Sequence, residues 1–158
     1  MRRQFNDLES FAAHLRVVRA ALPRAIQLEL AVLGEAVVKD AKAKFGIYQP
    51  GWPQLAEDTQ EARVKQGYSP DDPLLRTGAL RDLVTSKVHF RGIFVGVQVG
   101  TLLTEGTHSV DAATVMGAQE FGTDDHRIPP RPVFGPLVKD ARKYAEGLVF
   151  RSLKRAGL

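Results

Sequence analysis

Apolar residues near the start of the chain recur at the spacing of an α-helix. They lie three or four positions apart between Asp7 and Ala21, and Asn6 or Asp7 can cap the helix with a side-chain oxygen. Proline lacks a backbone N–H, so we expect Pro23 to break this helix or to restart it as a second one. The apolar positions of the first helix are Leu8, Phe11, Ala12 and Leu15.

A second helix is expected to run from Pro23 to Phe45, with Gly46 as its C-terminal cap. Its main apolar stripe spans roughly 120° of the helix surface. Leu28 and Val32 lie outside this stripe, so the helix is apolar on two sides. In a chain of 158 residues the second side can be covered by another subunit. The stripe consists of Ile26, Leu30, Leu33, Val37, Ala41 and Phe45.

The next segment, residues 46–73, has prolines and glycines at both ends and predicts an ordered loop with a short helix at about 58–66. The large ring of Trp52 in this irregular segment is typical of a side chain that anchors a loop to the core. Beyond the loop, Thr77 is expected to cap a helix that Gly78 enters.

The pattern then changes to alternation. Residues 85–90 and 93–99 read as two strands joined near Arg91 and Gly92, which predicts a β-hairpin with one buried face. Later, three prolines within residues 129–132 force an extended segment. The final helix, opened by Pro136, is expected to bury Leu137, Ala141, Tyr144, Ala145 and Leu148 and to leave Phe150 on its polar side.

These patterns predict an α+β fold in a single domain, residues 1–158. It would comprise long helices in an N-terminal region (1–45), a loop and sheet region (46–138) and a C-terminal helix (136–158). The sheet would be mostly antiparallel, built on the central hairpin, with the C-terminal helix packed on it.

Composition and charge narrow the class of protein. The chain is 44% hydrophobic and has no cysteine, which favours a globular intracellular protein without disulfides or thiolate metal sites. No targeting segment or membrane span is expected. The net charge of +4 is unevenly spread: residues 1–45 and the last twenty are basic, whereas the middle is acidic. Basic ends could dock on the acidic middle of another copy, although ordinary solvated helix faces explain the same pattern.

The strongest candidate for catalysis is the acidic segment around Asp124, Asp125 and His126, which Glu120 or His108 could complete as a metal site. Adjacent residues cannot all face one ion without a special turn, and no known ligand spacing is present. Loop solvation therefore explains the segment better. The same holds for Asp71 and Asp72, which precede a proline and indicate a turn.

Other catalytic motifs are missing from the sequence. No serine lies in a nucleophile elbow, and the segment "RTGAL" lacks the glycines and the lysine of a phosphate-binding loop. Neither a serine nucleophile nor a phosphate-binding loop is therefore expected.

Five motifs in a fixed order, between residues 51 and 138, carry a resemblance to a known family. They are "GWPQLAEDT", "PLLRTGALRD", "GVQVGT", "AQEFGT" and "IPPRPVFGPLV". In this order they are similar to the neck and tail-completion proteins of tailed bacteriophages, the group that includes the virion morphogenesis proteins of Mu-like phages and the related head-to-tail joining family. The chain departs from that pattern at residues 116–118, where the family commonly has a tyrosine-alanine pair.

The resemblance implies a small α+β protein that forms a ring, often of six copies, in the virion neck after assembly in the host cytoplasm. It implies no enzyme activity, and no cofactor or metal is expected. Its neighbours would be the head connector or head-closure protein on one side and the tail terminator or tail tube on the other, with DNA passing through the lumen without being read. On this view the "EFGT" and "PPRP" loops become ordered against a neighbour. The expected interface residues are Leu28, Val32, Glu120, Phe121, Arg131 and Phe150.

Two other classes of function stay open. A nucleic-acid-binding module would explain the net positive charge and the basic last helix, and its affinity would fall steeply with salt. A small metal-dependent hydrolase would explain the acidic segment with its histidine, and removal of the metal would abolish its activity.

Overall fold

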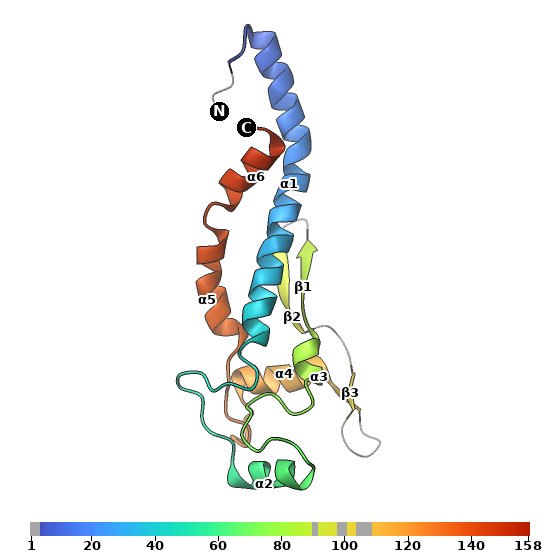
Figure 1. Ribbon diagram of the computed structural model, residues 1–158, viewed down its shortest axis with the longest axis vertical. Coiled ribbons are helices and arrows are strands. Elements are labelled where there is room, and N and C mark those ends of the chain that lie inside the picture. Colours follow the sequence, from blue (N-terminus) through green and yellow to red (C-terminus); the bar gives the residue numbers. More distant parts are fainter. Residues whose placement is uncertain (1–3, 90–91, 98–100, 104–108) are drawn as a thin grey trace.

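One long helix sets the shape of the molecule. This helix, α1 (Leu8–Lys42), has 35 residues and runs along the long axis (Figure 1). The carboxylate of Asp7 caps it by accepting a hydrogen bond of 2.7 Å from the backbone N–H of Ser10. No helix in the described part of the chain is long and apolar enough to cross a membrane. The structure, a computed structural model, describes residues 4–89, 92–97, 101–103 and 109–158.

The predicted break at Pro23 is wrong, because α1 continues through this residue. Proline removes one hydrogen bond and crowds the carbonyl four residues earlier, which belongs to Arg19. Both Pro23 and Arg19 are exposed, so water can bind that carbonyl. The opposite side of the helix packs through Val18 and Ala25 against the C-terminal helix. Tertiary packing therefore holds the helix together where local preference would interrupt it.

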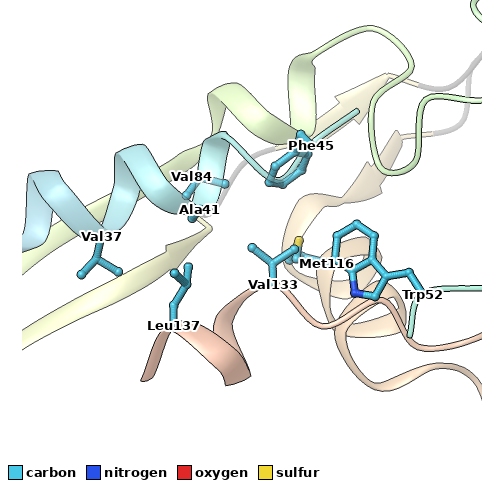
Figure 2. Packing of buried hydrophobic residues seen from close by; sticks show 8 residues of the cluster. All are labelled: Val37, Ala41, Phe45, Trp52, Val84, Met116, Val133 and Leu137. Atoms are coloured by element: carbon cyan, nitrogen blue, oxygen red, sulfur yellow. The ribbon is translucent and has the colours of Figure 1, made fainter. Parts of the chain in front are cut away.

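The C-terminal half of α1 is flanked by a hairpin and by another helix (Figure 1). The hairpin pairs β1 (Val84–His89) with β2 (Gly92–Val97) in antiparallel register, with Val84 opposite Val97. The helix is α5 (Phe134–Ala145). Buried side chains from α1, β1, α4 (Ala112–Phe121), α5 and the loops meet there (Figure 2). They are Val37, Ala41, Phe45, Trp52, Val84, Met116, Val133 and Leu137.

This cluster confirms the expected core face of α1 at Val37 and Ala41, and it confirms Trp52 as the anchor of its loop. Phe45 is buried as expected, although it lies in the turn after α1, which ends at Lys42 and not at Phe45. The loop also carries α2 (Glu57–Lys65), which has no buried residue.

The predicted mostly antiparallel sheet is wrong, because the protein is mainly helical. The alternating residues do form a hairpin, but in the described residues it gains no third strand; a second short ladder joins β3 (Thr101–Leu103) to β4 (Ser109–Asp111). Within the expected loop and sheet region (46–138), residues 112–121 instead form the helix α4 (Ala112–Phe121). The expected turn residue Arg91 lies outside the described residues.

The expected single helix over residues 136–158 is also wrong. It is divided into α5 and α6 (Leu148–Ala156) by Gly147, whose φ of 75° is left-handed. Neither part lies on the face of a large sheet: α6 packs along the N-terminal half of α1 (Figure 1). Ala145 is exposed and Leu148 is half-buried, whereas the side chains of residues 141–144 lie outside the description.

The "RTGAL" step begins a short helix, α3 (Ala79–Asp82). The capping position belongs to Gly78, with φ of 87°, and not to Thr77 as expected. The hydroxyl of Thr77 still accepts a hydrogen bond of 3.3 Å from the backbone N–H of Ala79.

Candidate assembly surface

The part of the molecule that extends away from the large core is the arm, which we define as residues 8–32 of α1 together with α6. All other described residues form the body. The core of the arm is small: Val18, Ala25 and Ala156 are its buried members, with Ala21 and Leu22 packed against them. Small side chains let the two helices approach closely, but they bury little apolar area.

An ion cluster around the buried side chain of Glu29 fixes α6 on α1. The side chain of Glu29 is only 6% exposed, and its two oxygens accept hydrogen bonds of 2.8 Å from Arg151 Nε and Arg155 Nη2. Hydrogen bonds from Arg151 and then Arg155 hold the pKa of Glu29 below its usual value of 4.5. Because both guanidinium groups come from α6, the cluster sets the position of this helix along α1.

An apolar groove runs beside this contact. Its volume is about 440 Å³, and one wall comes from α1 while Leu153 and Leu158 lie on the other side. The wall of α1 is formed mainly by Leu15, Val18, Leu22, Ile26 and Leu30. The groove is thus a concave apolar surface that the described chain leaves open.

A second apolar surface lies elsewhere around α1. Val17, Leu28 and Val32 are 64%, 43% and 60% exposed. At 3.6 residues per turn, this row is rotated roughly 150° from the groove wall. The expectation that α1 is apolar on two sides is therefore confirmed, and the second side is uncovered.

The six residues expected at an interface do not share one environment. Leu28, Val32, Phe121 and Phe150 are exposed, with Phe121 83% and Phe150 71% accessible. Three of these four lie on the arm, whereas Phe121 ends α4 in the body. Glu120 and Arg131 are 9% and 4% exposed, so their side chains are not available to a neighbour.

Glu120 instead caps α5. Its carboxylate accepts hydrogen bonds from the backbone N–H groups of Val133 (2.7 Å), Phe134 (3.0 Å) and Gly135 (2.7 Å). These groups would otherwise be unpaired at the positive end of the helix, where a carboxylate is favourable. In the sequence, Pro136 indicated the start of this helix. The capping role of Glu120 was missed because this residue comes 13 positions before Val133.

Arg131 is also committed within the chain. Its Nε and Nη2 donate to the carbonyl of Pro53 at 3.1 and 3.0 Å, and Nη2 also donates to the carbonyl of Gln54 at 3.0 Å. The guanidinium of Arg131 is therefore bound to carbonyl groups of the loop around Trp52 and does not take part in the expected interface. The "EFGT" and "PPRP" motifs meet inside the body, where these two side chains hold them in place, and no neighbour is needed to order them.

The acidic segment is organised as a turn. Asp125 accepts hydrogen bonds from the hydroxyl of Thr123 (2.6 Å) and the backbone N–H of Arg127 (3.2 Å), and both bonds lower its pKa. His126 has a left-handed φ of 56°. Among the described residues no group of three His, Asp or Glu side chains could hold a metal ion, and His108 lies outside those residues.

Asp71 also has a structural partner, because it accepts a hydrogen bond of 2.5 Å from the hydroxyl of Tyr48. Burial, with a further contribution from this bond, raises the pKa of Tyr48. The hydroxyl in turn accepts a bond of 2.9 Å from the backbone N–H of Leu55, which ties the loop to the end of α1. The expectation that Asp71 belongs to a turn agrees with this geometry.

Comparison of the chain with protein-family models, with curated proteins and with solved structures finds no match. The resemblance to phage neck proteins therefore rests on the order of the five motifs.

Proposed function

We propose that this protein is a non-enzymatic structural subunit that assembles into a ring in the neck of a tailed bacteriophage and joins the head connector to the tail. The motif order supports the family. The observation that carries the proposal is the pair of apolar surfaces on different sides of the arm, the groove and the row of Val17, Leu28 and Val32.

A closed ring of identical subunits needs two different surfaces on each copy, one for each neighbour. The groove and the exposed row meet this requirement, since they lie roughly 150° apart around α1. Burying such residues contributes about 25 cal/mol for each Å² of apolar surface. A single apolar contact between two subunits is weak. Assembly therefore becomes favourable when ring closure repeats the contact, or when subunits bind to a neighbouring protein that is already in place.

The basic residues of α6 also favour a structural role over nucleic-acid binding. Arg151 and Arg155 are bound to Glu29, so they do not contribute to a free basic stripe. In the proposed ring, DNA passes through the opening without being read. The head connector or head-closure protein would contact one side, and the tail terminator or tail tube the other.

The test changes one residue on the exposed row and one on α6, Val32→Asp and Phe150→Asp. A carboxylate cannot be buried at an apolar contact without a large cost, so we expect both variants to lose self-association and to yield few joined particles. The native mass at increasing protein concentration measures the first effect, and electron microscopy of particles measures the second.

The matched control is Ala20→Asp, which adds the same charge at an exposed position of α1 outside both surfaces. It should assemble as the unmodified chain does, and circular dichroism should show that all three variants are folded. If folded Val32→Asp and Phe150→Asp proteins still give normal numbers of complete particles, these residues are not at the contact. If heads and tails join without the protein, the adaptor function itself is wrong.

A further inference from the structure

The body contains a cavity of about 570 Å³ that no feature of the proposed ring uses. It opens between α2, α3, α4 and the loop that follows α4. Four arginines contribute to its lining, and none of the described lining residues is an aspartate or a glutamate. These arginines are Arg63, Arg76, Arg127 and Arg131.

Two of the four arginines are held in place by neutral groups. Arg131 donates to the carbonyls of Pro53 and Gln54, as described above. Arg63 Nη1 donates to the carbonyls of Asp72 at 2.7 Å and Leu75 at 3.3 Å. Carbonyl groups orient a guanidinium without neutralising it, so the wall keeps two fixed positive charges.

Burial of these two arginines disfavours their charged forms, and this lowers the pKa of both side chains. Burial lowers the pKa of Arg63, and the nearby charge of Arg76 lowers it further, only partly offset by Asp72. Burial lowers the pKa of Arg131 as well. A bound anion would relieve the repulsion between these cations.

The other two arginines can turn toward a ligand. Arg76 is exposed, and its guanidinium lies 5.6 Å from the centre of the Tyr68 ring. Arg127 is 86% exposed, and its Nε lies 3.3 Å from an oxygen of Asp125. Exposed contacts of this kind are weak, so either arginine can leave its present partner and bind a better-placed carboxylate of a ligand.

The rest of the lining is largely apolar. Leu55, Leu74, Leu80, Val115 and Ile128 contribute to it, so the cavity offers room for an apolar side chain beside the positive charges. We propose that this cavity binds a short peptide segment of another protein in which carboxylates flank an apolar side chain. Arginine suits this role because its planar fork can bind a carboxylate through two hydrogen bonds.

A nucleic acid fits the same surface less well. Single strands bind by stacking their bases on aromatic rings, and no aromatic side chain is among the described lining residues.

The elements that line the cavity, α2, α3 and α4, lie toward the opposite end of the molecule from the arm (Figure 1), so its occupation does not depend on the proposed ring contacts. Failure of one proposal would leave the other intact.

The test is the binding of a fluorescein-labelled peptide, Asp-Glu-Leu-Phe-Asp-Glu, to the full chain, followed by fluorescence anisotropy. We expect saturable binding that weakens about tenfold when the acids are replaced by Asn and Gln, since hydrogen bonds to charged groups are lost. Arg76→Gln and Arg127→Gln should each weaken binding to a similar degree. Neither side chain bonds to the backbone in the described structure, so both variants should fold.

Arg24→Gln is the matched control, because it removes one exposed positive charge from α1, outside the cavity. It should bind the peptide as the unmodified chain does. Ala62→Trp is a second probe, since it fills the cavity from α2 without changing the charge, and it should also weaken binding. Equal binding of the amide peptide, equal loss with Arg24→Gln, tighter binding of an oligothymidylate, or no saturable binding would overturn the proposal.

Discussion

The body and the arm are stabilised in different ways. In the body, large side chains such as Phe45, Trp52 and Val133 close a core, and the buried charges of Glu120 and Arg131 are bound to backbone groups. In the arm, the buried apolar residues are few and small, and the main polar contact joins the side chains of Glu29, Arg151 and Arg155.

This difference indicates which part of the molecule can bury its core without a partner. The core of the body is closed by its own large side chains, whereas the small core of the arm lies beside an open groove and a row of apolar side chains in solvent. The arm is therefore folded in the single chain, but it gains stability when another surface covers it. Three predictions test this division.

The largest effect is expected in the body, from Glu120→Ala. It leaves three backbone N–H groups at the start of α5 without their partner, which costs about 3 kcal/mol or more. For a chain of this size the thermal midpoint should fall by roughly 6–12 °C, as followed by circular dichroism. Glu120→Gln keeps one acceptor oxygen, so its loss should be smaller. A fall in the midpoint of Glu120→Ala by less than about 3 °C would contradict the assigned role.

The second effect is expected in the arm and depends on pH. The folded pKa of Glu29 lies below its ordinary value of 4.5, so its stabilising contribution is complete above that pH and is lost as the pH falls through the folded pKa. We expect α6 to leave α1 on acidification below 4.5, before the core of the body opens.

The chain has no cysteine, so spin labels at Ala20→Cys and Lys154→Cys can report the distance between the two helices. In a Glu29→Gln background the distance should lose its dependence on pH in this range, since an amide does not titrate. Persistence of the transition in that background would assign it to other carboxylates, such as Asp7 or Asp111, whose pKa values are also lowered by capping bonds.

The smallest effects are expected at the start of α3 in the body. Gly78→Val places a branched side chain at a φ of 87°, where strain costs about 1–3 kcal/mol. Thr77→Ala removes only the long bond to Ala79, so about 0.5 kcal/mol is expected. Denaturant unfolding of both variants measures the two values. If Thr77→Ala were the more harmful change, the hydroxyl would be the true cap.

Sequence reasoning predicted the core face of α1 and the anchoring role of Trp52, because periodicity and ring size are local properties. It failed at Pro23, where packing of Val18 and Ala25 outweighs the local preference of proline. The hairpin was visible as alternation, but alternation does not reveal how many strands a sheet contains.

The helix α4 was missed because Thr114, Val115 and Gly117 are poor helix formers. The side chain of Asp111, which accepts a hydrogen bond of 2.9 Å from the backbone N–H of Thr114, was the capping signal that could have revealed it. The partners of Glu120 and Arg131 are set by tertiary structure, so the pattern of nearby residues could not identify them. The exposure of Phe150, in contrast, follows from its place on the helix.

The ion cluster of the arm has a consequence for protein synthesis. Glu29 is joined to residues that follow it by 122 and 126 positions. A ribosome adds about 5–20 residues per second, so the exposed helix α1 waits roughly 6–25 s before α6 can cover it. During this interval the nascent chain presents the apolar side of Val18 and Leu22 to the solvent. Chaperone occupancy on the growing chain should thus rise early and fall only after Arg155 has emerged.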